Sequence, residues 1–388
     1  ARFGLRTEYL GEEWMANCAA SIDEGGKVGF GSWLYDDDCW PSGLCSGKTA
    51  AAHPDFRARY LLLARDGVFL PSEKLPVDQG LLTLLARYRV LQESGKLPAF
   101  TEVGPEEADA SDILTAYACW APAVGPTQDA YPDYLNGETI CEFIRNTYEV
   151  YAKHFADDFG KTVPGIFTDE PRLYHMPWSV RMAVEFKKRR GYDLVPRIPH
   201  LFYETDQASK VRHDYWLTVA DLFEEAYVKQ LGDWCRKHDL LLTGHLMFEQ
   251  NLSSQVRFSG GTMRHYVHMQ VPGIDILGEK IDEVITCKQA ASVANQFGMD
   301  RVLSELYGCT GYNFSFEGQK WIGDWQMALG VNLLCQHLAH YTLKGPAKRD
   351  FPPSYSYQSP WWHHYRYMAD YQARLSYVLT QGKPVRDI

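Results

Sequence analysis

Residues 163–171 read VPGIFTDEP, a short apolar run that ends in two carboxylates. A similar layout occurs at 302–308, where VLSELYG carries Glu305 inside an apolar run. Runs of this length between helical patterns are typical of the parallel strands of βα units. Further runs of this kind lie at 28–35, 112–119, 240–246, 273–277 and 331–338.

The stretches between these runs carry apolar residues at helical spacing. Within 138–159, for example, Phe143, Tyr151 and Phe155 fall on one face of a helix. We therefore predict helices at 12–23, 138–159, 211–238, 282–297, 317–329 and 361–379.

The alternation of strands and helices predicts an α/β fold, a (β/α)8 TIM barrel that forms one catalytic domain over residues 1–388. The chain supplies seven candidate strands, so we expect it to be a fragment whose barrel lacks its first strand, which would precede residue 1. An inserted excursion at about 55–110 follows the second strand. We expect the barrel to resume with the run at 112–119.

Nearly every predicted strand ends in polar or aromatic side chains. In such barrels the active site forms at the carboxyl ends of the strands. One carboxylate there is more often a helix cap than a catalyst, but several on one mouth repel each other and indicate a functional site. The candidate substrate-binding residues are Asp36, Asp38, Trp40, Asp169, His245, Glu249, Asp275, Tyr307 and His337, with His340 nearby.

Glu170 and Glu305 are the candidate catalytic pair. Hydrolysis of a glycoside needs one carboxylic acid to protonate the leaving oxygen and a second carboxylate as base or nucleophile. The alternative for Glu170 is a carboxylate that stabilises a helix N-terminus, which Pro171 would also fit. For Glu305 the alternative is weaker, because a charge inside an apolar strand is costly unless it faces a wet cavity.

The composition excludes several classes of protein. The formal net charge of −10 and the scattered basic residues argue against nucleic acid as a partner. No run of 18 apolar residues is present, so we expect no membrane segment. The nine cysteines lack zinc-ligand spacing and favour reduced thiols in a cytoplasmic protein, although a removed leader stays open because the chain begins at Ala1.

Cofactor and nucleophile motifs are equally informative. The acidic ring offers oxygen ligands that suit Ca²⁺, but no contiguous calcium loop occurs, so the identity of any metal is left unknown. There is no GxSxG elbow after a strand, no GxGxxG and no Walker loop. The high aromatic content of 14% suits stacking on sugar faces.

Several segments resemble the catalytic barrel of α-L-rhamnosidases of glycoside hydrolase family 106. They are RFGLRTEYLGEEW at 2–14, WLYDDDCWPSG at 33–43, GIFTDEP at 165–171, LLTGHL at 241–246, SELYGCTGYNFSFEGQKWIGDWQMALGVN at 304–332, LAHYTLKGPAKRDFPPSYSYQSPWW at 338–362 and RLSYVLTQGKP at 374–384. The resemblance implies a barrel that removes a terminal sugar, above all rhamnose, by inversion, with assistance from calcium. It also implies that Glu170 is the general acid and Glu305 its partner.

The leading hypothesis is therefore hydrolysis of a terminal α-L-rhamnoside of an oligo- or polysaccharide by a glutamate pair. Two alternatives stay open. A β-galactosidase-like clan A glycosidase also places glutamates on barrel strands, and a catalytically inactive barrel could bind sugar without cleaving it. The sequence leaves the sugar, the linkage and the oligomeric state undetermined.

Overall fold

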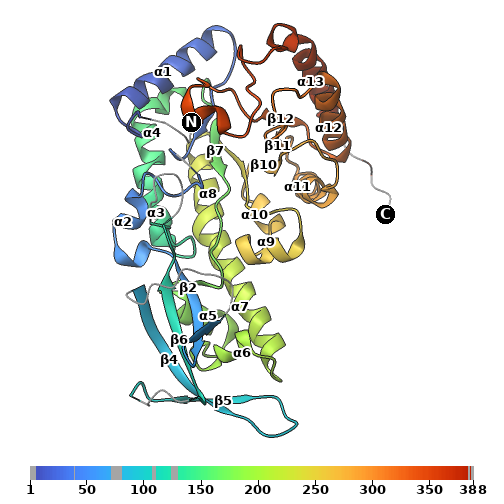
Figure 1. Cartoon of the computed structure of the whole chain (residues 1–388). Helices are drawn as coiled ribbons and strands as arrows, with labels where there is room; N and C mark the ends of the chain where they lie inside the picture. The colour runs from blue at the N-terminus through green and yellow to red at the C-terminus, as the bar shows by residue number, and fades with distance from the viewer. Residues whose placement is uncertain are drawn as a thin grey trace.

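A computed structural model describes residues 6–38, 40–70, 81–106, 111–123, 130–382 and 385. Two sheets organise these residues, one parallel and one antiparallel (Figure 1). No helix in the described part of the chain is both long and apolar enough to cross a bilayer.

The parallel sheet has six strands, all joined by parallel pairing. Its order is the order along the chain: β1 (Leu34–Tyr35), β7 (Gly165–Asp169), β9 (Leu241–His245), β10 (Val271–Ile276), β11 (Leu303–Leu306) and β12 (Leu333–Gln336). The sheet curls into a half-barrel (Figure 1). Sequential neighbours in one sheet are what repeated βα units produce, so the α/β prediction holds at this level.

Helices precede or follow these strands, as predicted. They are α1 (Glu12–Lys27), α3 (Gly137–Asn146), α4 (Tyr148–Phe155), α7 (Ala208–Phe223), a π-helical turn (Glu224–Val228), α8 (Lys229–Lys237), α11 (Val284–Phe297), α12 (Phe316–Leu329) and α13 (Tyr365–Leu379). The helix expected at 138–159 is broken at Thr147, whose φ of −122° and ψ of −66° are not helical. The helix expected at 211–238 is continuous through the π turn.

The second sheet is antiparallel and lies at the lower end of Figure 1. It contains β2 (Arg59–Arg65), β3 (Val68–Leu70), β4 (Leu82–Leu91), β5 (Ala99–Val103) and β6 (Ile113–Trp120) in the order β3-β2-β6-β4-β5. A short strand β8 (Pro177–Trp178) pairs with β2. Residues 71–80 and 107–110 of the expected excursion lie outside the described residues.

The run at 112–119 does not return to the parallel sheet, so that prediction is wrong. It forms β6, which pairs antiparallel with both β2 and β4. Because β6 is central in its sheet, most of its residues are buried, and its pattern reads like that of a buried parallel strand. Six of the seven predicted runs therefore contribute to the parallel sheet.

Shorter helices connect these elements. They are α2 (Lys48–Ala51), α5 (Met182–Arg190), α6 (Pro199–Phe202), α9 (Leu252–Ser259) and α10 (Met263–Tyr266), with 3-10 turns at Pro54–Phe56, Ala156–Asp158, Val195–Arg197, Gly345–Arg349 and Trp362–His364. The core between the sheets and helices is rich in tyrosine, and Tyr60, Tyr134 and Tyr227 are fully buried.

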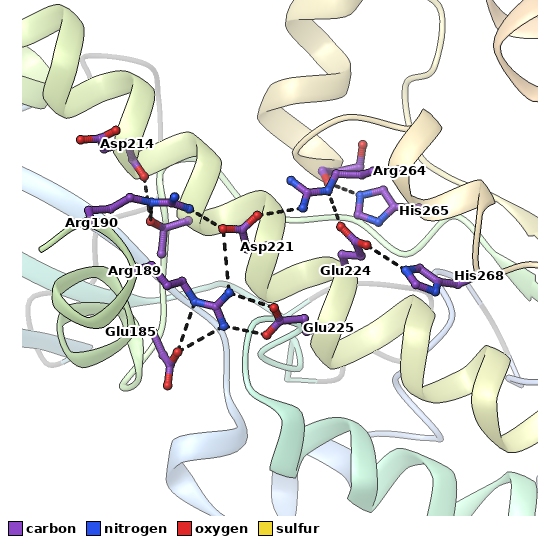
Figure 2. Close-up of polar contacts among 12 residues, drawn as sticks. Glu185, Arg189, Arg190, Asp214, Asp221, Glu224, Glu225, Arg264, His265 and His268 are labelled. Carbon is purple, nitrogen blue, oxygen red and sulfur yellow. Dashed lines mark hydrogen bonds and ion pairs between the residues drawn. The ribbon is translucent and has the colours of Figure 1, made fainter. Parts of the chain in front are cut away.

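A network of ion pairs joins α5 to α7 and α10 (Figure 2). Arg189 binds Glu225 through both terminal nitrogens, at 2.8 and 2.6 Å. Arg264 binds Asp221 at 2.8 Å and also Glu224, whose other oxygen lies 2.8 Å from His268. The partly buried arginines of this region are thus matched by carboxylates.

Candidate active site

The register of the parallel strands brings the predicted strand-end residues together. Asp169 on β7 pairs with His245 on β9, and Asp275 on β10 pairs with Glu305 on β11. Ligand atoms of Asp169, His245 and Glu305 all lie within 4.8 Å of one another. Atoms of Glu170, His245 and Asp275 form a second such group, so His245 is shared by both.

His245 is the hub of this cluster and has no exposed surface. Its Nε2 atom lies 2.9 Å from Glu305 Oε2 and 3.7 Å from Asp169 Oδ1. Burial alone would lower the pKa of His245, but the hydrogen bond and charge of Glu305, with the charges of Asp275 and Asp169, hold it well above the usual value. The surrounding carboxylates therefore favour the protonated form of the ring.

Glu170 follows β7 in a left-handed backbone conformation, with φ of +49°. Its N–H donates to the carbonyl of His245 at 3.1 Å, and the Trp40 indole N–H donates to Oε2 of its carboxylate. Burial raises the pKa of Glu170, and the charges of Asp169 and Glu305 add to that rise. His245 and Trp40 act against it, but the net effect favours the protonated acid.

Glu305 is 6% exposed and lies between two histidines. His245 contacts Oε2, and His337 Nε2 lies 3.6 Å from Oε1. A carboxylate that accepts from an imidazolium is held in its ionised form. Glu170 and Glu305 thus differ in environment, since Glu170 accepts from Trp40 and Glu305 lies between two histidines.

Asp275 completes the cluster from β10. Its backbone N–H donates to Glu249 Oε2 at 3.2 Å. Burial raises the pKa of Asp275 well above its usual range; His245 lowers it, and Glu305 and Glu170 raise it further. Its Oδ1 atom is buried and has no hydrogen-bond partner among the described residues.

Glu249 lies next to the cluster, in the loop between β9 and α9. It is 4% exposed, and its carboxylate accepts from the N–H groups of Leu246 and Asp275 and from the Tyr266 hydroxyl. Burial is the main reason that the pKa of Glu249 rises to about 7. The Glu249 carboxylate is thus engaged by protein donors and supports the cluster from its backbone side.

The three aspartates after β1 each accept hydrogen bonds from the loop that follows them. Asp36 is buried and accepts from the hydroxyls of Ser42 and Tyr148. Asp38 accepts from the N–H and the hydroxyl of Ser46 at 3.0 and 2.9 Å. Their carboxylates are thus engaged by protein donors.

The side chain of Tyr307 does not join the cluster of strand-end residues. It is fully buried, its hydroxyl donates to the carbonyl of Gln319 at 2.8 Å, and its ring packs against Phe314 and Tyr355. His340 likewise faces the carbonyl of Asp350, at 3.1 Å.

Sequence reasoning missed three residues that shape the site. The hydroxyl of Tyr35 donates to Asp169 Oδ2, and Ser42 Oγ accepts from the Asp169 N–H at 2.7 Å. Asp37 binds three backbone N–H groups. Tyr35 ends the first apolar run, so its strand-end position was a usable signal, whereas nothing in the sequence distinguishes Asp37 from its neighbours.

The donor set is compatible with a hard cation. Asp275 Oδ1 is a buried oxygen without a hydrogen bond, and Glu170 lies in the same group. His245 would have to stay outside the ligand set, because calcium prefers oxygen and the ring carries a proton.

Parallel strands with acidic side chains at their carboxyl ends define an α/β half-barrel of the kind that carries enzyme active sites. The chain belongs to glycoside hydrolase family 106, described as alpha-L-rhamnosidase, whose family model matches residues 121–388.

Two further proteins are similar to this chain. The solved structure of a rhamnosidase from Novosphingobium sp. PP1Y superposes with a TM-score of 0.59 at 20% identity, over 73% of this chain and 30% of that one. At this identity the likeness concerns the fold. A protein of Formosa agariphila, provisionally named as a beta-glucuronidase, is 25% identical over 242 residues, which cover 60% of this chain and 20% of that protein.

Proposed function

We propose that this chain carries the catalytic centre of a glycoside hydrolase that removes a terminal α-L-rhamnose from an oligo- or polysaccharide. One observation carries the proposal. Two glutamates lie in one cluster of strand ends, where burial raises the pKa of Glu170 while His245 stabilises the charge of Glu305. Environments that make the pKa values of two neighbouring carboxyl groups differ in this way are typical of an acid and base pair.

In the proposed reaction Glu170 donates its proton to the glycosidic oxygen as the bond to the sugar breaks. Glu305 accepts a proton from a water molecule, whose oxygen bonds to the anomeric carbon from the opposite face. The leaving sugar departs with the proton of Glu170, and the product has inverted configuration. His245 keeps Glu305 ionised until it takes the proton from water.

The choice of rhamnose rests on family membership. The chain spans only 20% of the curated relative and 30% of the solved rhamnosidase. The activity and the sugar are therefore proposed for the whole protein that contains this chain.

The proposal includes three finer points. The half-barrel would be the larger part of a (β/α)8 barrel, closed by further parallel strands between β12 and β1. A divalent cation held by Asp275 would supply positive charge to sugar hydroxyls. A cytoplasmic location is supported by the absence of disulfides among the cysteines that the structure describes, and cell fractionation would test it.

The test compares aryl α-L-rhamnoside with aryl β-D-galactoside as substrates of the full-length protein, beside Glu170→Gln and Glu305→Gln. We expect hydrolysis of the rhamnoside alone and a loss of about 10²- to 10⁴-fold in kcat for Glu305→Gln. Preference for the galactoside would favour the β-galactosidase-like alternative. Binding without turnover of either glycoside would favour an inactive sugar-binding barrel.

A further inference from the structure

The antiparallel sheet at the lower end of Figure 1 has two faces with different surroundings. On one face the Tyr88 hydroxyl of β4 donates to the carbonyl of Val195, and Phe100 of β5 packs against the rings of His200 and Tyr203. Paired residues and residues two apart along a strand share a face, so Tyr88 and Phe100 point the same way. The helix α6 and the 3-10 turn before it therefore cover the β4 and β5 part of this face.

The opposite face holds a cleft of about 810 Å³. Its floor comes from paired positions of neighbouring strands. Ala64 of β2 is paired with both Phe69 and Thr115, and Leu84 of β4 is paired with Tyr117 of β6. Thr115 and Tyr117 are two residues apart on β6, so all five side chains lie on one surface. Ligand sites commonly have volumes of about 300 to 1,000 Å³, and this cleft falls within that range.

The floor of the cleft is aromatic and apolar but only partly covered. The rings of Phe69 and Tyr117 are 6.3 Å apart with 55° between their planes, and both side chains are half-buried. Leu84 is 44% exposed. A ligand with apolar C–H faces, such as a sugar ring, would remove this surface from water and pack against the aromatic rings.

Thr115 adds an unsatisfied polar group to this floor. It is only 6% exposed, and among the described residues its hydroxyl has no hydrogen-bond partner. The Tyr117 hydroxyl also has no partner within that part of the chain. Buried hydroxyl groups are usually hydrogen-bonded, because an unmade hydrogen bond is costly. A ligand that carries hydroxyl groups of its own would satisfy both side chains.

The rim of the cleft carries one charge of each sign. Arg65 Nε donates to the carbonyl of Ser111 at 3.0 Å and lies 4.0 Å from a carboxylate oxygen of Asp66. Because the two charges offset each other, the rim does not select an anion. A guanidinium donates hydrogen bonds and a carboxylate accepts them, so together they suit the hydroxyl groups of a sugar.

Resting on the function proposed above, we infer that this cleft binds a sugar residue of the polysaccharide substrate at a position outside the catalytic centre. The floor, the unsatisfied hydroxyls and the mixed rim match a carbohydrate. The other end of β2 lies nearer the barrel, where Tyr60 packs against Tyr174. Ala64 is four residues further along β2, roughly 14 Å away at the usual rise of a strand. The cleft would hold the polymer on the protein and raise the local concentration of its chain ends.

The kinetic test compares gum arabic, a soluble polysaccharide with terminal α-L-rhamnosyl residues, with an aryl α-L-rhamnoside that occupies the catalytic centre alone. In the full-length protein, Leu84→Asp places a charge on the apolar floor. It should lower kcat/KM about 5- to 20-fold for gum arabic and change it less than about 2-fold for the aryl rhamnoside. Equal losses on both substrates would mean that the sheet only supports the catalytic centre, and the inference would be overturned. An unchanged kcat/KM for gum arabic would overturn it as well.

Leu91 offers a matched control for Leu84. It lies on the same strand and is 48% exposed, but it is not among the residues that line the cleft. Leu91→Asp should therefore leave kcat/KM for both substrates unchanged. A loss on gum arabic as large as that of Leu84→Asp would show a general effect of charge on the sheet and would count against the inference.

A second variant tests the hydroxyl of the floor. Thr115→Val keeps the shape of the side chain and removes its hydroxyl, so kcat/KM for gum arabic should fall about 3- to 10-fold. The value for the aryl rhamnoside should stay that of the wild type. A gum arabic value equal to that of the wild type would contradict the role given to this hydroxyl.

Binding separates failure of the inference from failure of the proposed reaction. Affinity electrophoresis of Glu170→Gln in gels that contain gum arabic needs no turnover. Adding Leu84→Asp to this protein should raise the Kd about 5-fold or more. If the Kd rises but the wild-type protein releases no rhamnose, the proposed reaction fails while the cleft stands. If the Kd stays the same, the inference fails.

The other possible occupant of an open sheet face is a second copy of the chain. Sedimentation velocity of the wild type and of Leu84→Asp distinguishes the two occupants. We expect the same mass for both proteins. A dimer that dissociates in Leu84→Asp but not in Leu91→Asp would assign this face to a protein interface and overturn the inference.

Discussion

The imidazole of His245 lies 2.9 Å from the carboxylate of Glu305, although 60 residues separate the two along the chain. The contact joins strand β9 to strand β11 across β10, so it depends on the curl of the sheet. It sets a histidine whose pKa is held well above its usual value against a buried glutamate.

Glu170→Gln and Glu305→Gln should respond differently to the leaving group. A nitrophenolate leaves without protonation, so Glu170→Gln should lose about 10- to 100-fold less activity on a nitrophenyl rhamnoside than on a rhamnosyl disaccharide. Glu305→Gln should lose equally on both, because water must be activated in either case. Parallel losses for the two variants would contradict the assigned roles.

The alkaline limb of the pH profile should report Glu170, since activity is lost as pH rises through the pKa of the acid. The Trp40 N–H lowers that pKa, so Trp40→Phe should move the limb of kcat/KM to higher pH. The charge of Asp169 raises it, so Asp169→Asn should move the limb to lower pH. Shifts in one common direction would show that another group controls the limb.

Glu249→Gln should destabilise the protein and reduce kcat, although glutamine has the same shape as glutamate. Its amide nitrogen would face an N–H donor, either of Asp275 or of Leu246, and leave one buried group unsatisfied. We expect a loss of about 1 to 3 kcal/mol in the free energy of unfolding, measured with urea. Tyr266→Phe removes a donor without touching Asp275, so its kcat should stay near that of the wild type.

Asp37→Ala should destabilise the protein without any direct effect on chemistry. The carboxylate accepts from the N–H groups of Gly43, Leu44 and Cys45 at 2.7, 2.7 and 3.1 Å. In the variant these three buried N–H groups lose their acceptor. We expect the free energy of unfolding, measured with urea, to fall by about 3 kcal/mol or more. Asp38→Ala is the control, and because that side chain is half-buried we expect less than about 1 kcal/mol.

Removal of a bound cation should lower the melting temperature. If Asp275 holds one, calcium added after EDTA treatment should raise Tm by about 2 to 5 °C through binding to the folded state. Asp275→Asn should abolish this response. An unchanged Tm on addition of calcium to the EDTA-treated wild type would count against the cation site.

Much of the fold could be predicted because buried parallel strands have a clear pattern. The runs at 163–171, 240–246, 273–277 and 302–306 coincide closely with β7, β9, β10 and β11. The run that became β6 shows the limit, since burial on both faces removes the alternation that would identify an antiparallel strand. Pairing direction depends on distant partners that local pattern does not report.

The site was predictable to the level of strand ends but not of side-chain direction. Asp169, Glu170, His245, Asp275 and Glu305 do converge. Tyr307 turns away because its φ of +75° redirects the chain directly after β11. Asp36 and Asp38 are engaged by loop donors that only the folded chain brings near. Their contacts with substrate stay a prediction.

The pairing of β8 with β2 has a consequence for how the molecule could change. Glu170, the proposed acid, is only seven residues before Pro177, where β8 begins. There the chain pairs with β2 at Tyr60, and β8 becomes an edge strand of the antiparallel sheet. Excising that sheet to obtain a minimal barrel would release the loop that follows Glu170. Variation in the inserted sheet could therefore alter the position of this carboxyl group while the residues on β9, β10 and β11 stay unchanged.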